Sequence, residues 1–492
     1  METIHLKTVD PISQKLLLSA SQQRLELPWE RYEKLQPQDG FLRLGLSCPF
    51  GCMQGPCRID PFGRGPQNGV CGLAKDEMAA GLLLRLCLQG TMDAMAGVSS
   101  EDDTPAIVFS PVLRTLVDKA LSSDDQKDLS LDDIVKSNQL LNRPLSTYNT
   151  LLSQALRLSL LTLGFQEQSA LAAASESIPC RIGYGTLTGQ QVRIGISGRP
   201  SAPLVASLTN AVKQESGNSA LLVSLGEWIL QEDQFMPIAC TSGESELLVS
   251  SGAIHLLVAG VGSDPGLIGL CHKLNIPVTT DGTDAAPAEI VEQARKRSAS
   301  VSQVDLFSAV PFAEVHQVLM SHSQAAAMIK EDQDGKIALI GGSDTPQLSL
   351  GGLPSELSTL LSDKGVQIGG WGDAALWILK NKPQPEEGDT LFHTLDNRQG
   401  PLLVVKGLAS MGRLDWLQGI CFTGLKSCQE LSAALGLAYL GCRVSSATPI
   451  PVRGSSTVTK ELSDMLQRNG GELLHFDHPP QPEELSDWLT NC

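Results

Sequence analysis

The chain has 492 residues, of which 42% are hydrophobic, and this is enough for two or three globular domains with large cores. Its net charge of -17 argues against nucleic acid and anionic membrane surfaces as partners, because both repel an acidic protein. No apolar run approaches the roughly 20 residues needed to cross a bilayer, and no secretory leader pattern opens the sequence, so we expect a cytoplasmic protein without membrane insertion.

The first part of the chain is predicted to be helical. Asp10, which is followed by proline, marks the start of a helix. Apolar residues then recur with a helical period over 75–95, 111–121 and 147–163. We therefore expect a helical domain over residues 1–190.

From residue 191 onward, short runs rich in aliphatic residues alternate with helical patterns. A first round of strands is expected at 192–197, 220–224, 255–260 and 276–280. A second round is expected at 336–342, 366–369, 402–405 and 473–476. Such alternation predicts parallel sheets with helices on both faces, so the fold class is α/β with Rossmann-like domains over 191–333 and 334–492. The glycine-rich strand ends lack the full dinucleotide fingerprint, which gives no basis for a nucleotide site.

Four cysteines stand close together in one loop: Cys48, Cys52, Cys57 and Cys71. The gaps between them hold three, four and thirteen residues and are rich in glycine and proline, which lets the backbone turn tightly enough for the sulfurs to converge. Gathered thiolates bind iron–sulfur clusters or zinc. Zinc ribbons usually pair two short knuckles, whereas three of these cysteines share one loop, so the spacing favours a 4Fe-4S cluster. Zinc and a set of ordinary buried thiols are the alternatives.

The eight other cysteines are scattered along the chain, which fits a reducing compartment better than a disulfide framework. The ordinary role of such a residue is that of a small buried hydrophobic side chain. The sequence leaves open whether Cys240 or Cys428 takes part in a second metal site.

The cysteine loop, residues 48–71, carries a family resemblance. Residues 57–76 closely resemble the cluster-binding loop of anaerobic nickel–iron carbon monoxide dehydrogenases, and residues 441–462 are also similar to that family. The resemblance implies a helical domain followed by two Rossmann-like domains. It also implies that the four loop cysteines hold the internal 4Fe-4S cluster of the family.

The same resemblance implies that two other metal centres have lost their ligands in this chain. The cluster that bridges two subunits in the family takes cysteines around residues 38–40 and at Ser47, where none is present. The histidine ligand of the nickel–iron centre falls on Arg199, and the catalytic lysine falls on Leu431. Of the cysteine ligands of that centre, one is matched by Cys240 and the others fall near Gly262, Gly342, Trp371–Gly372 and Ala409.

Glycine, alanine and arginine supply no soft ligand, so we expect no nickel–iron cluster and assign no catalytic residue. The favoured hypothesis is a carbon monoxide dehydrogenase-like protein with one 4Fe-4S cluster, acting as an electron-transfer or redox-sensing subunit. Its expected partner is a ferredoxin-like protein or a flavin or iron–sulfur subunit, and a homodimer without the bridging cluster is compatible with this reading. The alternatives are a divergent enzyme that oxidises carbon monoxide with a ferredoxin-type acceptor, and a scaffold in which the cluster is structural.

Overall fold

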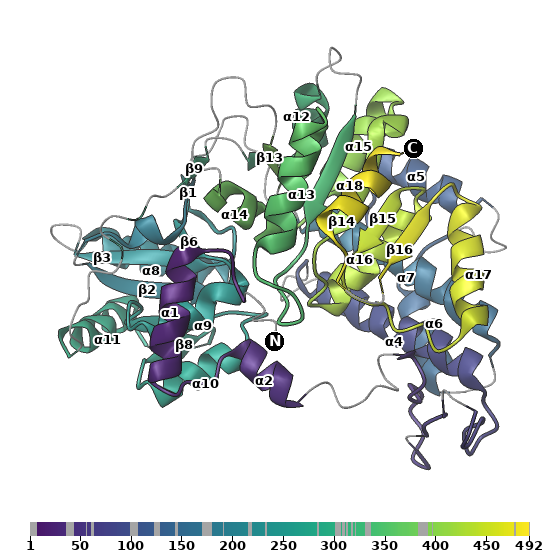
Figure 1. The fold of residues 1–492 in the computed structure, drawn as a ribbon, viewed down its shortest axis with the longest axis horizontal. Helices are drawn as coiled ribbons and strands as arrows, with labels where there is room; N and C mark the ends of the chain where they lie inside the picture. The colour runs from purple at the N-terminus through teal and green to yellow at the C-terminus, as the bar shows by residue number, and fades with distance from the viewer. Residues whose placement is uncertain are drawn as a thin grey trace, which may run out of the picture.

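The computed structural model describes most of the chain. The described residues are 7–35, 44–55, 57–60, 63–98, 107–122, 128–142, 146–169, 180–189, 191–214, 219–231, 234–282, 285–300, 307, 310, 313–315, 318–319, 321–329, 336–381, 392–395, 397–476 and 479–491. Within them, a set of N-terminal helices precedes two sheets, each with seven strands (Figure 1). The predicted fold class is confirmed.

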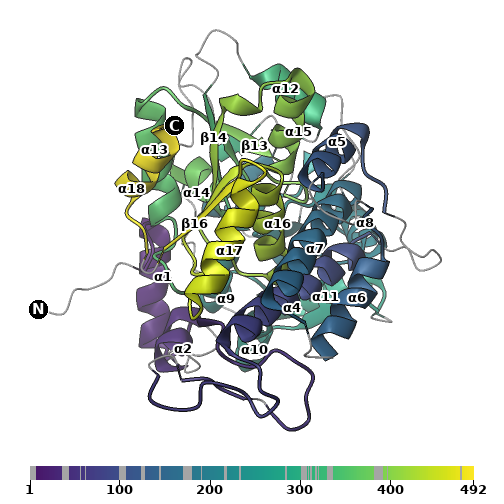
Figure 2. The ribbon, with the colours of Figure 1, turned by 90° about the vertical axis from the view of Figure 1, so that its right-hand side faces the viewer.

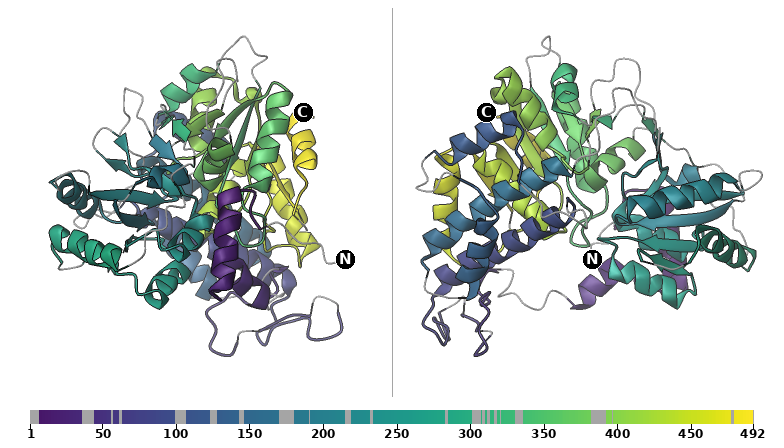
Figure 3. Two further views of the ribbon diagram at one scale, coloured as in Figure 1. Left: turned by 60° about the vertical axis from the view of Figure 1, so that its left-hand side comes forward. Right: turned by 180° about the vertical axis from the view of Figure 1, so that it is seen from behind.

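The N-terminal helices divide into two groups. They are α1 (Pro11–Gln22), α2 (Pro28–Leu35), α4 (Lys75–Ala96), α5 (Pro111–Ala120), α6 (Asp132–Asn142) and α7 (Tyr148–Gln168). The Asp10 carboxylate accepts a hydrogen bond from the backbone N–H of Ser13 at 2.7 Å, which confirms the predicted helix start. However, α1 and α2 bury their apolar faces against the first sheet and its helices, while α4, α6 and α7 pack together beside the second sheet (Figure 3).

The first sheet has the strand order β8-β7-β2-β3-β6-β1-β9 and is parallel except for β9. Its strands are β1 (Cys180–Ile182), β2 (Val192–Ser197), β3 (Ala220–Leu225), β6 (Ile238–Cys240), β7 (Leu256–Ala259), β8 (Val278–Thr280) and β9 (Ala313–Val315). A small hairpin joins β4 (Leu230–Gln231) to β5 (Gln234–Phe235). The helices that follow the strands of the first sheet are α8 (Ala202–Gln214), α9 (Ser245–Ser250), α10 (Pro265–Lys273) and α11 (Pro287–Ala299).

The second sheet has the order β10-β13-β12-β11-β14-β15-β16 and is parallel throughout. Its strands are β10 (Val318–Leu319), β11 (Ile337–Gly341), β12 (Gln367–Gly370), β13 (Phe392–Leu395), β14 (Leu417–Phe422), β15 (Arg443–Ser446) and β16 (Glu472–His475). Its helices are α12 (His322–Met328), α13 (Gly352–Asp363), α14 (Gly372–Asn381), α15 (Leu402–Met411), α16 (Cys428–Tyr439), α17 (Ser456–Gln467) and α18 (Pro482–Thr490). The domain boundaries at 190 and 333 stay a prediction.

One predicted strand is wrong. Residues 402–405 lie in helix α15, which begins after Pro401 and ends at Gly412 with a left-handed φ of 67°. Both faces of the first two turns of this helix are buried, so the four apolar residues do not show the helical period. A short apolar run of this kind does not distinguish a buried helix from a buried strand.

The helices α4, α7 and α16 pack closely enough to join the helical bundle to the second sheet (Figure 2). A Cβ atom on Gly90 of α4 would lie 2.3 Å from the carbonyl oxygen of Cys428, so only glycine allows this approach of α4 to α16. The buried hydroxyls of Thr91, Thr162 and Ser432 form a chain, with oxygen–oxygen distances of 3.0 and 2.8 Å. This contact places α4, and the loop that precedes it, in a fixed position relative to the second sheet.

Candidate functional site

The cysteine loop projects from the N-terminal end of α4, away from both sheets (Figures 1 and 2). Its two arms pair at the base. The backbone N–H of Cys48 donates to the carbonyl oxygen of Cys57 at 3.0 Å, and that of Ile59 donates to Leu46 at 3.2 Å. Leu46 and Ile59 are both fully buried. The loop therefore has an anchored base below an exposed tip.

The segment 441–462, whose sequence is also similar to the family, supports this base. The backbone N–H of Gly454 donates to the carbonyl oxygen of Leu44 at 2.7 Å. A Cβ atom at Gly454 would lie 2.5 Å from Cγ of Leu46, so the close contact requires glycine. On the other side, the N–H of Gly51 donates to the carbonyl of Leu141 in α6 at 3.1 Å.

The four loop thiols differ in exposure. Cys52 and Cys71 are exposed, and Cys48 and Cys57 are half-buried. Backbone N–H groups point at two of the sulfurs: Gln54 donates to Sγ of Cys52 and Val70 donates to Sγ of Cys57, both at 3.4 Å. Burial raises the pKa of the Cys48 thiol, and the nearby Cys57 and Cys71 thiols add to the rise.

The donor chemistry of the loop fits an iron–sulfur cluster, because soft thiolates with N–H donors toward sulfur are the surroundings that such clusters use. A Cβ atom at Gly69 would lie 3.0 Å from Cε of Met78, so glycine relieves a tight contact between the loop and α4. Among the described residues, however, no three Cys, His, Asp or Glu side chains are gathered closely enough to hold a metal ion. Convergence of all four sulfurs stays a prediction.

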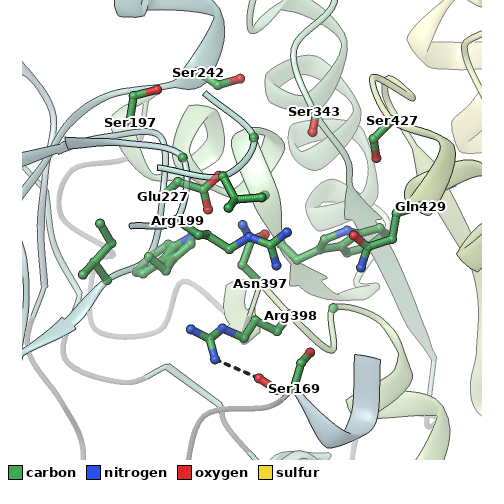
Figure 4. A pocket seen from close by; sticks show the side chains of 18 of the residues that line it. Ser169, Ser197, Arg199, Glu227, Ser242, Ser343, Asn397, Arg398, Ser427 and Gln429 are labelled. Atoms are coloured by element: carbon green, nitrogen blue, oxygen red, sulfur yellow. Dashed lines mark hydrogen bonds between the residues drawn. The ribbon is translucent and has the colours of Figure 1, made fainter. Parts of the chain in front are cut away.

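A second feature is a cavity of about 660 Å³ between the two sheets (Figure 4). It lies beyond the carboxyl ends of β2, β3 and β7 in the first sheet and of β11, β12 and β14 in the second, where parallel sheets place their ligand sites. Four positions where the family resemblance indicated lost metal ligands line it together: Arg199, Gly262, Trp371 and Gly372. The rest of the wall mixes polar, charged, aliphatic and aromatic side chains.

The other positions carried over from the family lie outside the wall of this cavity. Cys240 is the last residue of β6 and is only 1% exposed, and burial raises the pKa of its thiol well above the ordinary value. Leu431 is buried in α16, and Ala409 in α15 lines a different hollow. None of the described residues that line the central cavity is a cysteine or a histidine.

A buried ion-pair network, which no sequence motif predicted, lies between the two sheets. The Lys380 ammonium in α14 lies 2.6 and 2.7 Å from the two carboxylate oxygens of Glu244 and 3.4 Å from Asp10. It also lies 4.7 and 4.4 Å from the ring centres of Tyr184 and Trp377. Burial alone would lower the pKa of Lys380, but the Glu244 and Asp10 carboxylates outweigh it and raise that pKa.

Two further carboxyl groups extend this network, of which Asp373 is buried and Asp344 is half-buried. Asp344 accepts hydrogen bonds from the Thr241 hydroxyl at 2.6 Å and from the Trp377 indole at 2.9 Å. Asp373 accepts from the backbone N–H and the hydroxyl of Ser242 at 2.8 and 2.5 Å. Burial raises the pKa of Asp344 to about 8, and the Asp373 carboxylate adds to the rise. These contacts connect α1, the first sheet and the second sheet.

The combination of a helical bundle with two parallel sheets and a cavity between them defines the carbon monoxide dehydrogenase fold. The chain has a TM-score of 0.77 with carbon monoxide dehydrogenase IV from Carboxydothermus hydrogenoformans, at 17% identity over 98% of each chain. It has a TM-score of 0.81 with the carbon monoxide dehydrogenase of Thermococcus sp. AM4, at 16% identity over 99% of this chain and 98% of the other. At such identities the likeness shows the fold.

The sequence comparison agrees over a shorter stretch. The chain is 46% identical over 89 residues to carbon monoxide dehydrogenase 1 of Methanosarcina mazei and 48% identical over 83 residues to carbon monoxide dehydrogenase 1 of Carboxydothermus hydrogenoformans. These stretches span 18% and 17% of this chain but only 14% and 13% of the relatives. No family model matches. The chain thus resembles the anaerobic carbon monoxide dehydrogenases, and the resemblance seen in the sequence is confirmed.

Proposed function

We propose that this chain is a carbon monoxide dehydrogenase-like iron–sulfur protein in which Cys48, Cys52, Cys57 and Cys71 hold one 4Fe-4S cluster. It serves as an electron-transfer or redox-sensing subunit and lacks the nickel–iron centre. When bound, the cluster supplies one-electron exchange. The observation that carries the proposal is the contrast between a loop that presents four thiols and a central cavity that presents none.

The loop supports the proposal because its base is fixed while its sulfurs stay within reach of solvent and of the backbone N–H groups of Gln54 and Val70. Hydrogen bonds of this kind to cluster sulfurs raise the reduction potential. The residue types alone also suit zinc, and the resemblance to the carbon monoxide dehydrogenases is what favours iron.

The cavity supports the absence of a nickel–iron centre. A centre of that kind needs thiolate or imidazole ligands on most of its metal atoms. The described wall offers the Arg199 guanidinium and the backbones of Gly262 and Gly372 at positions where the family has ligands, and Cys240 is buried behind it. A guanidinium is permanently cationic and repels metal ions.

A partner at the loop tip fits the redox role. Met53 is fully exposed and Val70 is 72% exposed, although both are apolar, and both lie within the cysteine loop. Large exposed apolar side chains on a projecting loop are available for a protein contact. We propose a ferredoxin-like protein or a flavin or iron–sulfur subunit as the occupant. No helix among the described residues combines the length and the apolar character needed to span a membrane.

The test is metal analysis of anaerobically purified protein. We expect about four irons per chain with a broad absorption that dithionite bleaches, no nickel, and no carbon monoxide oxidation with viologen dyes after nickel and reductant are supplied. Cys57→Ser and Cys71→Ser should each remove most of the iron. Cys428→Ser is the matched control, because this half-buried thiol lies in α16, where its contact is with Gln89.

Zinc in place of iron would contradict the cluster assignment. Nickel together with more than four irons, and turnover that survives a comparison with Cys71→Ser, would favour the divergent enzyme instead. If neither a dye nor a protein donor can reduce the cluster, its role in this protein is structural.

A further inference from the structure

The central cavity has the size and position of a small-molecule site. Its volume of about 660 Å³ lies within the roughly 300–1,000 Å³ range of ligand pockets. Parallel strands of both sheets end at its wall, and helix α7 contributes Gln166 and Ser169. Figure 4 shows Arg199 and Glu227, which follow β2 and β3, and the neighbouring Asn397 and Arg398, which follow β13, around this space.

Most charged groups of the cavity wall already have partners. The Lys426 ammonium lies 3.6 Å from Asp264, whose other carboxylate oxygen accepts from the backbone N–H of Gly266 at 2.8 Å. Glu430 accepts from the backbone N–H groups of Lys426 and Ser427 at 2.7 and 3.0 Å. Asp264, Lys426 and Glu430 therefore have partners within the protein, so their polar atoms do not need a ligand.

Arg199 and Glu227 differ from the rest. Within the described part of the chain, neither side chain forms a hydrogen bond or an ion pair, although both line the cavity. Burial raises the pKa of Glu227, and the Arg199, Lys426 and Arg398 cations oppose the rise. Glu227 is half-buried and Arg199 is exposed at the cavity wall, so both side chains can reach a bound molecule.

Cationic and aromatic groups complete the wall. The Arg398 guanidinium donates to the carbonyl of Ser169 at 2.8 Å through one nitrogen, Nη1. The guanidinium of Arg199 is the strongest positive influence on Glu227. Trp228 and Trp371 add two indole rings that are 6% and 5% exposed, and such rings contact the apolar part of a bound molecule.

We infer that the cavity binds a small carboxylic acid that carries an amino or hydroxyl group. The carboxylate pairs with Arg199, and the amino or hydroxyl group donates to Glu227. The apolar body of the ligand lies against the indole rings. This site is independent of the cluster and goes beyond the electron-transfer role, because its residues lie between the sheets and not in the cysteine loop.

The test uses the full-length protein, purified without oxygen, with matched sets of probes: standard amino acids, their 2-hydroxy analogues, the corresponding unsubstituted acids, and inorganic phosphate. We expect at least one amino or hydroxy acid to raise the thermal unfolding midpoint and to change tryptophan fluorescence, which calorimetry then converts to a dissociation constant. The unsubstituted analogue should bind at least roughly tenfold more weakly, because it leaves Glu227 unpaired.

Variants separate the two ends of the ligand. Arg199→Gln and Glu227→Gln should each weaken binding by roughly tenfold or more, while Arg199→Lys should retain part of the affinity. Arg413→Gln is the matched control, since this exposed arginine stacks on Trp416 outside the cavity. Cys57→Ser should bind the acid normally, which separates this inference from the proposed function.

Two results would overturn the inference. One is the absence of any response to every acid in the panel. The other is that phosphate or an unsubstituted acid binds as tightly as the best amino or hydroxy acid, with an affinity that Glu227→Gln does not change. Circular dichroism of each variant distinguishes a lost site from a lost fold.

Discussion

The cysteine loop and the ion-pair network between the sheets both carry several reactive side chains, and they expose them to very different degrees. The loop leaves Cys52 and Cys71 exposed, with only its base packed. The network removes Lys380 and Glu244 from water, with Glu244 fully buried. Reactive groups that must exchange something with a partner stay accessible, whereas charges that hold two sheets together are stable only when they are paired and buried.

This contrast predicts that the two regions respond separately to mutation. Substitutions in the network should change the free energy of unfolding and leave the iron content of the folded chain unchanged. Substitutions of loop cysteines should lower the iron content and leave the free energy of unfolding unchanged. The predictions below test that separation, starting with the largest effect.

Lys380→Met should destabilise the protein by about 3–5 kcal/mol, because it leaves the buried Glu244 and Asp10 carboxylates without their cation. Urea unfolding of the anaerobic protein measures the loss, and iron per folded chain should match the unmodified protein. Lys364→Met is the matched control, since its pair with Asp487 at 2.9 Å is exposed and should be worth less than about 1 kcal/mol. Equal losses in the two variants would show that burial does not set the strength of the network.

Gly454→Ala tests the boundary between the two regions. The added Cβ atom would lie 2.5 Å from Cγ of Leu46 and 2.6 Å from the carbonyl oxygen of Leu44, both at the base of the loop. We expect a loss of about 1–3 kcal/mol from overpacking, together with faster loss of iron to a chelator. Chelation kinetics and urea unfolding measure the two effects.

Gly269→Ala is the control for that prediction, because a Cβ atom on Gly269 in α10 meets nothing within 4 Å. It should stabilise the helix by roughly 0.5–1 kcal/mol and leave iron release unchanged. Iron release from Gly454→Ala at the control rate would mean that the segment 441–462 does not support the loop.

Sequence patterns anticipated one of these two regions and missed the other. The loop is local, so cysteine spacing and glycine content identify it directly. The ion pair joins Asp10, Glu244 and Lys380, which lie more than a hundred residues apart and carry no motif. Local patterns also place most strands of both sheets, and they fail at 402–405, where complete burial of a helix removes the helical period.

The last effect concerns pH. Burial raises the pKa of Asp344 to about 8, far above the value of roughly 3.9 in an unfolded chain. The protonated folded form is therefore favoured, and this contribution to stability is complete below the unfolded pKa and is lost as the pH rises through about 8.

Asparagine in place of Asp344 stays neutral and keeps an acceptor for the Trp377 indole. The stability of Asp344→Asn relative to the unmodified protein should thus increase between pH 5 and pH 8, by at most about 1.4 kcal/mol per pH unit for one proton. Urea midpoints across that range measure the difference, and Asp487→Asn, at an exposed ion pair, should give a curve parallel to the unmodified protein. A parallel curve for Asp344→Asn as well would mean that the carboxyl group between the sheets is ionised at neutral pH and adds a negative charge to the Asp10, Glu244 and Asp373 carboxylates around the single lysine.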